Sequence, residues 1–136
     1  MYKNLAKTFF IGKNLVYLPS CHSTNDIASG LIKNDQFFDG TVVITNNQTA
    51  GKGQRGNTWE SNSGDNLMCS LVVRPRIKVQ ELFSLNMRIT LAIALALEDL
   101  LPDKRVEIKW PNDILIHRKK VGGILIENSI KGDEID

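Results

Sequence analysis

A short glycine-rich segment, Gly51-Lys52-Gly53-Gln54-Arg55-Gly56, is the strongest chemical signal in this 136-residue chain. Its glycines let the backbone approach a ligand closely, and successive N–H groups can form an anion-binding nest. Lys52 and Arg55 add positive charge to the same segment. The pattern is neither a P-loop nor a Rossmann fingerprint, because no Gly-Lys-Ser/Thr and no helix start follows it. A flexible basic surface loop is the alternative that the glycine pattern alone leaves equally open.

Trp59 and the segment Lys109-Trp110-Pro111-Asn112-Asp113 are two further candidates. Trp59 stands in polar surroundings, where it is either a core anchor, the commoner role of a lone tryptophan, or a stacking platform for a base or ring. A Pro-Asn-Asp sequence is most often only a turn between strands. Asn112 and Asp113 nevertheless carry side-chain oxygens suited to Mg²⁺ or to orienting a nucleophile.

Lys120 opens the apolar run 121–126. A lysine in that place is commonly a surface residue whose stem covers apolar area. In a functional role, its ammonium would stabilise developing phosphate charge. Ser23-Thr24-Asn25 offers hydroxyl and amide groups to a ligand, although helix capping alone explains this triplet. His22 and His117 have no neighbour at metal-ligand spacing, so we interpret both as structural.

The elements that must position these residues are short strands and two helices. We expect strands at 15–18, 41–45, 67–74, 106–110, 114–117 and 121–128, and helices from Ser23 or Thr24 to about Lys33 and over 80–101. The second half of the longer helix is apolar nearly all round, which predicts burial against a sheet. Strands joined by hairpins, with two helices inserted, indicate an α+β domain with a mostly antiparallel sheet.

Residues 46–66 form a polar stretch with four glycines, in which Ala50 and Trp59 are the apolar residues. A loop this long inside a small domain is usually functional or disordered. Near the end of the chain, 131–134 reads as a hairpin turn after which only Ile135 and Asp136 follow. We therefore expect that the chain is cut short, that strand 121–128 has an unpaired edge, and that this chain alone is poorly active.

The composition is that of an ordinary globular chain, with 42% hydrophobic and 24% charged residues. It excludes intrinsic disorder and a disulfide-dense mini-protein. The net charge of +2 does not predict nucleic-acid binding, although the basic run 118–120 leaves that alternative open. The sequence contains no signal-peptide pattern, and its longest apolar run, nine residues, is too short to cross a bilayer. We expect a cytoplasmic protein with no DNA or membrane partner.

Taken in order, four motifs resemble the biotin–protein ligases, also called biotin–[acetyl-CoA-carboxylase] ligases. They are the Ser23 triplet, the stretch 48–59 around the glycine segment, the segment 109–113, and Lys120 with the Val-Gly-Gly-Ile-Leu that follows. The resemblance spans roughly residues 15–128. It implies a class II synthetase-like catalytic domain, α+β with a mostly antiparallel sheet packed against helices, occupying 1–136 in part. Neither the N-terminal winged helix nor the C-terminal barrel of some members is expected here.

The resemblance implies a reaction that joins biotin to a specific lysine of a biotin carboxyl carrier protein. The biotin carboxylate attacks the α-phosphate of ATP, Mg²⁺ helps pyrophosphate leave, and the acceptor lysine then attacks biotinoyl-5′-AMP. The resemblance also leaves room for a homodimer. Two alternatives remain open: a lipoate–protein ligase that uses the same adenylation chemistry, and a non-catalytic module that only binds biotin or nucleotide.

The resemblance also implies roles for individual residues. Biotin would be bound by Ser23, Thr24, Gln48, Gly51 and Lys52. ATP and the adenylate would be bound by Gly53, Gln54, Arg55, Gly56, Trp59, Lys109 and Lys120. Lys120 and Asn112 would be the catalytic residues, and Asn112 with Asp113 would hold the metal. Gln54 stands where many members carry arginine, so Lys52 and Arg55 are expected to replace that charge.

Overall fold

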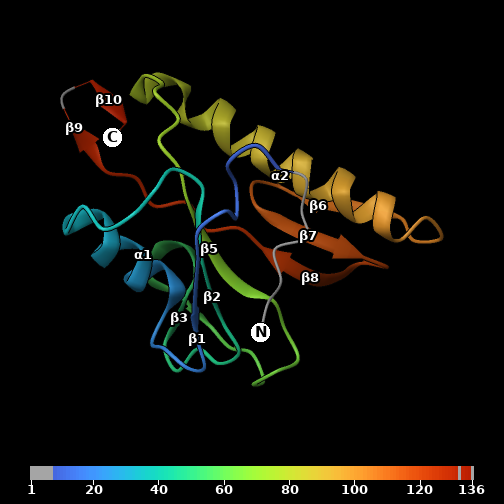
Figure 1. The fold of residues 1–136 in the computed structure, drawn as a ribbon. Coiled ribbons are helices and arrows are strands. Elements are labelled where there is room, and N and C mark those ends of the chain that lie inside the picture. Colours follow the sequence, from blue (N-terminus) through green and yellow to red (C-terminus); the bar gives the residue numbers. More distant parts are fainter. Residues whose placement is uncertain (1–7, 132, 136) are drawn as a thin grey trace. The chain divides into compact units, whose positions relative to one another are not determined.

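A computed structural model describes residues 8–131 and 133–135 of the chain. The chain divides after Arg74 into two units, and each is considered by itself (Figure 1). Among the described residues, the strands fall into four small sheets rather than one, and β1–β2 is the parallel pair among otherwise antiparallel pairs. The prediction of an α+β fold with mostly antiparallel pairing is confirmed.

The first unit is built on a three-stranded sheet of order β1-β2-β5. Its strands are β1 (Leu15–Leu18), β2 (Thr41–Thr45) and β5 (Met68–Val72). Helix α1 (Thr24–Lys33) packs against β2 and β5, and Figure 1 shows it beside this sheet. Ala28 of the helix meets Val43 and Val72 of the sheet in the buried core. The predicted strands and helix are confirmed, except that β5 is shorter than 67–74 at both ends.

Residues 46–66 contain a short hairpin that the sequence analysis did not predict. Strands β3 (Gly51–Lys52) and β4 (Thr58–Trp59) pair with each other, and a single 3-10 turn, η1 (Gln54–Gly56), connects them. The turn places Arg55 at φ +56° and Gly56 at φ +79°. Gly53 N–H donates to the Asn57 carbonyl at 2.7 Å. The two strands are short and mostly polar, so no hydropathy pattern indicated them.

The second unit is an antiparallel sheet of order β6-β7-β8 with one long helix on it. The strands are β6 (Val106–Lys109), β7 (Asp113–Ile116) and β8 (Lys119–Gly123). A 3-10 turn η2 (Val79–Glu81) leads into α2 (Leu82–Leu100), which packs on β6 and β7. The prediction of a strand over 121–128 is wrong at both ends. Asp113, the first residue of β7, pairs with Gly123, so the strand pairing ends there, and Ile124 bonds to Asn112 ahead of β7.

Helix α2 packs on a sheet, as its sequence predicts, but much of its apolar surface is left exposed. Thr90 and Ala94 are its buried residues, whereas Leu91 is 51% exposed and Leu95 is 52% exposed. The reason is that β6 and β7 contact one face of the helix, and a single sheet covers only an apolar stripe. The periodicity of apolar residues does not predict how many neighbouring elements pack on a helix.

The helical stretch Val79–Leu100 is also long and apolar enough to cross a membrane, judged by length and composition alone and within the described residues. The nine-residue apolar run of the sequence, 89–97, lies within this helix and is bounded by the charged residues Arg88 and Glu98. A helix packed on a sheet commonly has the same composition, and α2 does pack on a sheet.

Strands β9 (Ile130–Lys131) and β10 (Glu134–Ile135) form the hairpin predicted at 131–134. Gly132 in its turn lies outside the described residues. The return strand pairs with β9, and among the described residues β8 lies at the edge of its three-stranded sheet, which agrees with the expected unpaired edge. Ile135 is buried, and its N–H donates to the Ile77 carbonyl at 3.2 Å.

Candidate functional site

The first turn of α1 carries the residues predicted to bind biotin from the Ser23 triplet. Ser23 is the N-cap residue and is only 2% exposed, yet its side chain makes no capping hydrogen bond. Side-chain capping therefore does not explain this serine. The alternative interpretation, that the triplet at 23–25 only caps the helix, loses its main support. Thr24 is also buried, at 4% exposure.

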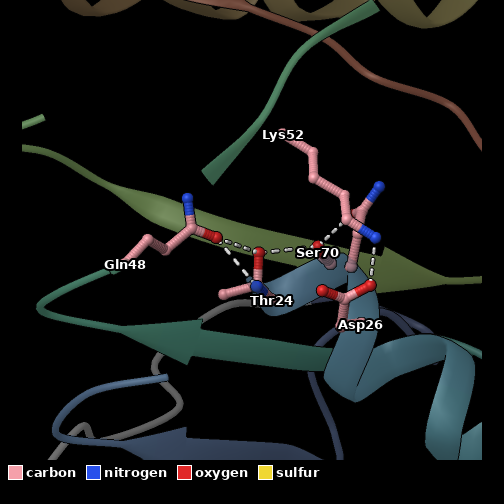
Figure 2. A network of polar contacts seen from close by, with 6 residues as sticks. Thr24, Asp26, Gln48, Lys52 and Ser70 are labelled. Atoms are coloured by element: carbon pink, nitrogen blue, oxygen red, sulfur yellow. Dashed lines mark hydrogen bonds and ion pairs between the residues drawn. The ribbon is translucent and has the colours of Figure 1, made fainter. Parts of the chain in front are cut away.

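Thr24 and Gln48 are joined by two hydrogen bonds, drawn in Figure 2. The Thr24 backbone N–H donates to Gln48 Oε1 at 2.8 Å, and the Thr24 hydroxyl donates to the same oxygen at 3.1 Å. Ser70 on β5 donates from its hydroxyl to Thr24 Oγ1 at 2.8 Å and also lies within hydrogen-bond distance of Asn25 Oδ1. The network holds the Gln48 side-chain oxygen at the start of the helix. The amide nitrogen of Gln48 is then the group that can donate hydrogen bonds to a ligand.

Gln48 is carried to the helix by backbone pairing between two segments that are distant in sequence. Cys21 and Gln48 form a parallel β-bridge. On either side of it, Cys21 N–H donates to the Asn47 carbonyl at 3.0 Å and Thr49 N–H donates to the Cys21 carbonyl at 2.9 Å. This pairing continues β1 and β2 past their last sheet residues, so the strand register places Gln48 beside the helix start.

Gly51 and Lys52 follow on the short strand β3. A Cβ on Gly51 would lie 2.5 Å from the Trp59 carbonyl and 3.1 Å from Gln48 Nε2, so this position requires glycine for close approach and not for a special φ. Lys52 Nζ forms an ion pair with Asp26 Oδ1 on α1, and both side chains are 45% exposed. The structure therefore brings Ser23, Thr24, Gln48, Gly51 and Lys52 around one helix start.

Residues 53–56, predicted to fold over an adenylate, form the turn of the β3–β4 hairpin. Gly53 and Gln54 are half-buried, whereas Arg55 and Gly56 are exposed. Trp59 is half-buried and pairs with Gly51. It is thus neither a deep core anchor nor a fully exposed platform, and its predicted stacking role stays a prediction.

In the second unit, Asn112 is locked to the segment after β8 by two hydrogen bonds. Its Nδ2 donates to the Ile124 carbonyl at 2.8 Å, and the Ile124 N–H donates to the Asn112 carbonyl at 3.0 Å. The Asn112 side-chain nitrogen therefore has a structural role. These two bonds do not involve the side-chain oxygen, Oδ1.

Lys120 lies within β8 on an exposed surface, and its Nζ is 2.8 Å from Asp113 Oδ1 on β7. Its side chain is 42% exposed and that of Asp113 is 18% exposed. Lys109 of β6 lies opposite Asp113 in the strand register. One carboxylate thus stands next to both predicted phosphate-binding lysines in this three-stranded sheet.

The residues predicted to hold magnesium are adjacent in the chain, and the Asp113 carboxylate pairs with Lys120 through Oδ1. No cluster of three or more His, Cys, Asp or Glu side chains exists among residues 8–131 and 133–135. Mg²⁺ commonly needs only one or two carboxylates when substrate phosphates supply the other ligands. The metal at Asn112 and Asp113 stays a prediction.

Comparison with known proteins assigns the chain. The sequence pattern of the biotin/lipoate A/B protein ligase family matches residues 17–135. The chain belongs to this family. It is 36% identical over 129 residues to the bifunctional ligase/repressor BirA of Bacillus subtilis, covering 95% of this chain and 39% of that protein. It is 40% identical over 95 residues to a biotin–[acetyl-CoA-carboxylase] ligase of Paracoccus denitrificans, covering 66% and 38%.

The fold also matches a solved ligase structure. The crystal structure of the Leishmania major biotin protein ligase in complex with biotinyl-5-AMP superposes with a TM-score of 0.73 at 31% identity. The match covers 90% of this chain and 54% of that one. The chain thus spans about two fifths of the length of the curated relatives given above. The predicted resemblance and fold class are confirmed.

The family comparison does not support every expectation about partners. The Bacillus relative is named a repressor as well as a ligase, so the expected absence of a DNA partner has no support. Two site residues were also missed from the sequence. Ser70 sits on the buried side of the alternating strand β5, a period-two signal that would have placed it toward α1. Asp26 has a position typical of an acid that favours the helix dipole, and no local signal links it to Lys52.

Proposed function

We propose that this chain is the biotin- and ATP-binding part of an enzyme that attaches biotin to a specific lysine of a biotin carboxyl carrier protein. The observation that carries this proposal is the Thr24–Gln48–Ser70 network at the start of α1, because it assembles the predicted biotin contacts from three separate segments. The Leishmania relative, bound to biotinyl-5-AMP, supports the same ligand class.

The network has the chemistry that a ureido ring requires. Such a ring offers one carbonyl acceptor and two N–H donors, so it needs hydrogen-bond donors and acceptors side by side. Ser23 and Thr24 supply hydroxyl oxygens, and Gln48 supplies amide donors on a side chain whose oxygen is already held. Since these groups are fixed before any ligand arrives, little side-chain entropy is lost on binding.

In the proposed first step, a carboxylate oxygen of biotin bonds to the α-phosphorus of ATP, and the bond to the bridging oxygen of pyrophosphate breaks. A carboxylate is a poor nucleophile toward an anionic phosphate, so cations and N–H donors must offset the charge. Lys52, Arg55 and Lys120 are the proposed cations. The backbone N–H groups of the β3–β4 turn are the proposed donors, and the hairpin would also shield the adenylate from water.

In the proposed second step, the amine of the acceptor lysine attacks the carbonyl carbon of the mixed anhydride. An amide bond forms, AMP leaves with the anhydride oxygen, and the amine loses a proton to solvent. Lys120 is proposed to exchange its Asp113 partner for the biotin carboxyl and the α-phosphate. Until the ligand arrives, the Asp113 carboxylate would hold the Lys120 ammonium in place.

Two alternatives stand beside this proposal. The family includes lipoate ligases, and isothermal titration separates the two substrates: biotin binding without lipoate binding is the expected result. A module that binds without turnover would release no pyrophosphate when mixed with ATP, Mg²⁺ and biotin. Release of pyrophosphate that depends on biotin supports the enzyme, and biotin binding with none released supports the module.

The setting of the enzyme is also proposed. Cys21 and Cys69 are free thiols in the structure, which suits the reducing cytoplasm.

A homodimer is proposed as well, and sedimentation of the chain with and without biotin tests it. Mass spectrometry of a biotin carboxyl carrier domain after incubation with the chain tests the acceptor, with one biotin on one lysine as the expected product.

A further inference from the structure

The first turn of α1 contacts a different segment with each of three consecutive side chains. Thr24 bonds to Gln48, Asn25 contacts Ser70, and Asp26 pairs with Lys52. Figure 2 shows Thr24 and Asp26 on the helix, with Gln48 and Lys52 reaching it from other segments. Thr24, Gln48 and Lys52 are predicted biotin contacts. The third contact joins the helix to the β3–β4 hairpin, and its partner on the helix, Asp26, has no assigned task.

The hairpin is short. Its two strands are two residues long and, among the described residues, pair with each other in a sheet of two strands. An isolated two-stranded hairpin is marginally stable in water. Ahead of the hairpin, Ala50 N–H donates to the His22 carbonyl at 2.9 Å. The ion pair of Lys52 with Asp26 adds a side-chain contact between hairpin and helix.

The position of Asp26 favours this tether. The residue lies in the first turn of α1, where the helix dipole stabilises a carboxylate. An ammonium and a carboxylate form a charge-assisted hydrogen bond, which is stronger than a neutral one. Both side chains are 45% exposed, so solvent screening keeps the tether weak enough to open when a ligand enters.

We propose that Asp26 is a positioning residue: its carboxylate holds Lys52, and through Lys52 the β3–β4 hairpin, at the start of α1. The consequence for ligand binding rests on the proposed function. If the hairpin supplies N–H donors to an anionic ligand, a hairpin held near the helix in advance loses less conformational entropy on binding. Neutralising Asp26 then weakens binding without removing any group that touches the ligand.

Amide hydrogen exchange of residues 51–59 in the ligand-free chain tests the tether directly. Asp26→Asn removes the charge and keeps the size, and exchange should become about two- to fivefold faster, the range expected for an exposed ion pair. Asp35→Asn is the matched control, because Asp35 pairs with Arg74 elsewhere in the first unit. Asp26→Glu should restore most of the protection. Equal exchange in D26N and D35N overturns the proposal.

Biotin titration tests the consequence. The Kd for biotin should rise about two- to fivefold in D26N and stay unchanged in D35N. The charge-exchanged pair Asp26→Lys with Lys52→Asp should recover part of the protection that either single change loses. Faster exchange with an unchanged Kd overturns the positioning role. If the unsubstituted chain binds no biotin, the proposed function fails, and the exchange rates still decide whether Asp26 holds the hairpin.

Discussion

The two units hold their predicted ligand-binding groups in different ways. In the first unit, Thr24 and Ser70 are buried, the Thr24 hydroxyl donates to Gln48, and the Ser70 hydroxyl donates to Thr24. In the second unit, Lys120 stands on an exposed strand and is oriented by the Asp113 carboxylate. Buried hydrogen bonds fix a shape, which suits recognition of a neutral ring. An exposed ion pair fixes a charge but lets it move, which suits a cation that must follow phosphate charge as it develops.

The largest expected effect is that of removing the Lys120 charge on the rate of adenylate formation. Lys120→Ala should slow adenylate formation about a hundredfold, corresponding to roughly 3 kcal/mol of lost charge stabilisation. Stability should hardly change, because an exposed ion pair contributes little to it. Pyrophosphate release at saturating ATP measures the rate, and thermal unfolding checks the fold. A near-normal rate in K120A would remove Lys120 from the proposed mechanism.

Local features could be predicted from the sequence, whereas contacts between distant residues could not. The β-branched run 41–45, the stop at Pro102 and the turn signals placed most elements, because these signals are local. The Lys52–Asp26 contact joins residues 26 apart and the Ser70–Thr24 contact joins residues 46 apart. No local pattern encodes such pairs. The exposed face of α2 was missed for a related reason. An apolar composition predicts that a helix is buried, but only the tertiary packing determines how much of its surface is buried.

The second prediction separates binding from folding within the buried network. Thr24→Val keeps the shape but removes the hydroxyl, so the Ser70 hydroxyl loses one of its partners. The free energy of unfolding should fall by about 1–2 kcal/mol, and the Kd for biotin should rise about tenfold. Denaturant unfolding and biotin titration measure the two effects.

Ser23→Ala is the matched control for that variant. Ser23 is buried beside Thr24 but makes no capping bond, so its loss should change stability by less than about 0.5 kcal/mol while still weakening biotin binding. If S23A destabilises the chain as much as T24V, the hydroxyl of Ser23 is structural, and the proposed separation between the two residues is wrong.

A third prediction concerns the junction between network and hairpin. Gly51→Ala would place a Cβ 2.5 Å from the Trp59 carbonyl, so the two short strands must separate. We expect a loss of about 1 kcal/mol in biotin binding, together with faster amide exchange at Thr58 and Trp59. Gly30→Ala within α1 is the control, because a Cβ there meets nothing within 4 Å. It should stabilise the helix slightly and leave biotin binding unchanged. Equal effects of the two substitutions would contradict the close approach.

The smallest expected effect lies in the turn that sets the register of Lys120 against Asp113. His117 has φ +51° and Arg118 has φ +61°, so both central residues of this two-residue hairpin adopt the left-handed region. Asn-Gly is the pair that suits such a turn, because side chains with a bulky Cβ substituent are strained there. His117→Asn with Arg118→Gly should raise the free energy of unfolding by about 1 kcal/mol, measured by denaturant titration. Replacing both residues with alanine removes the same side chains without relieving the backbone and should give no gain. Since the register of Lys120 is unchanged in the Asn-Gly variant, its rate of pyrophosphate release should match that of the unsubstituted chain. A stabilised sheet with a slower rate would mean that the strained turn itself serves the movement of Lys120.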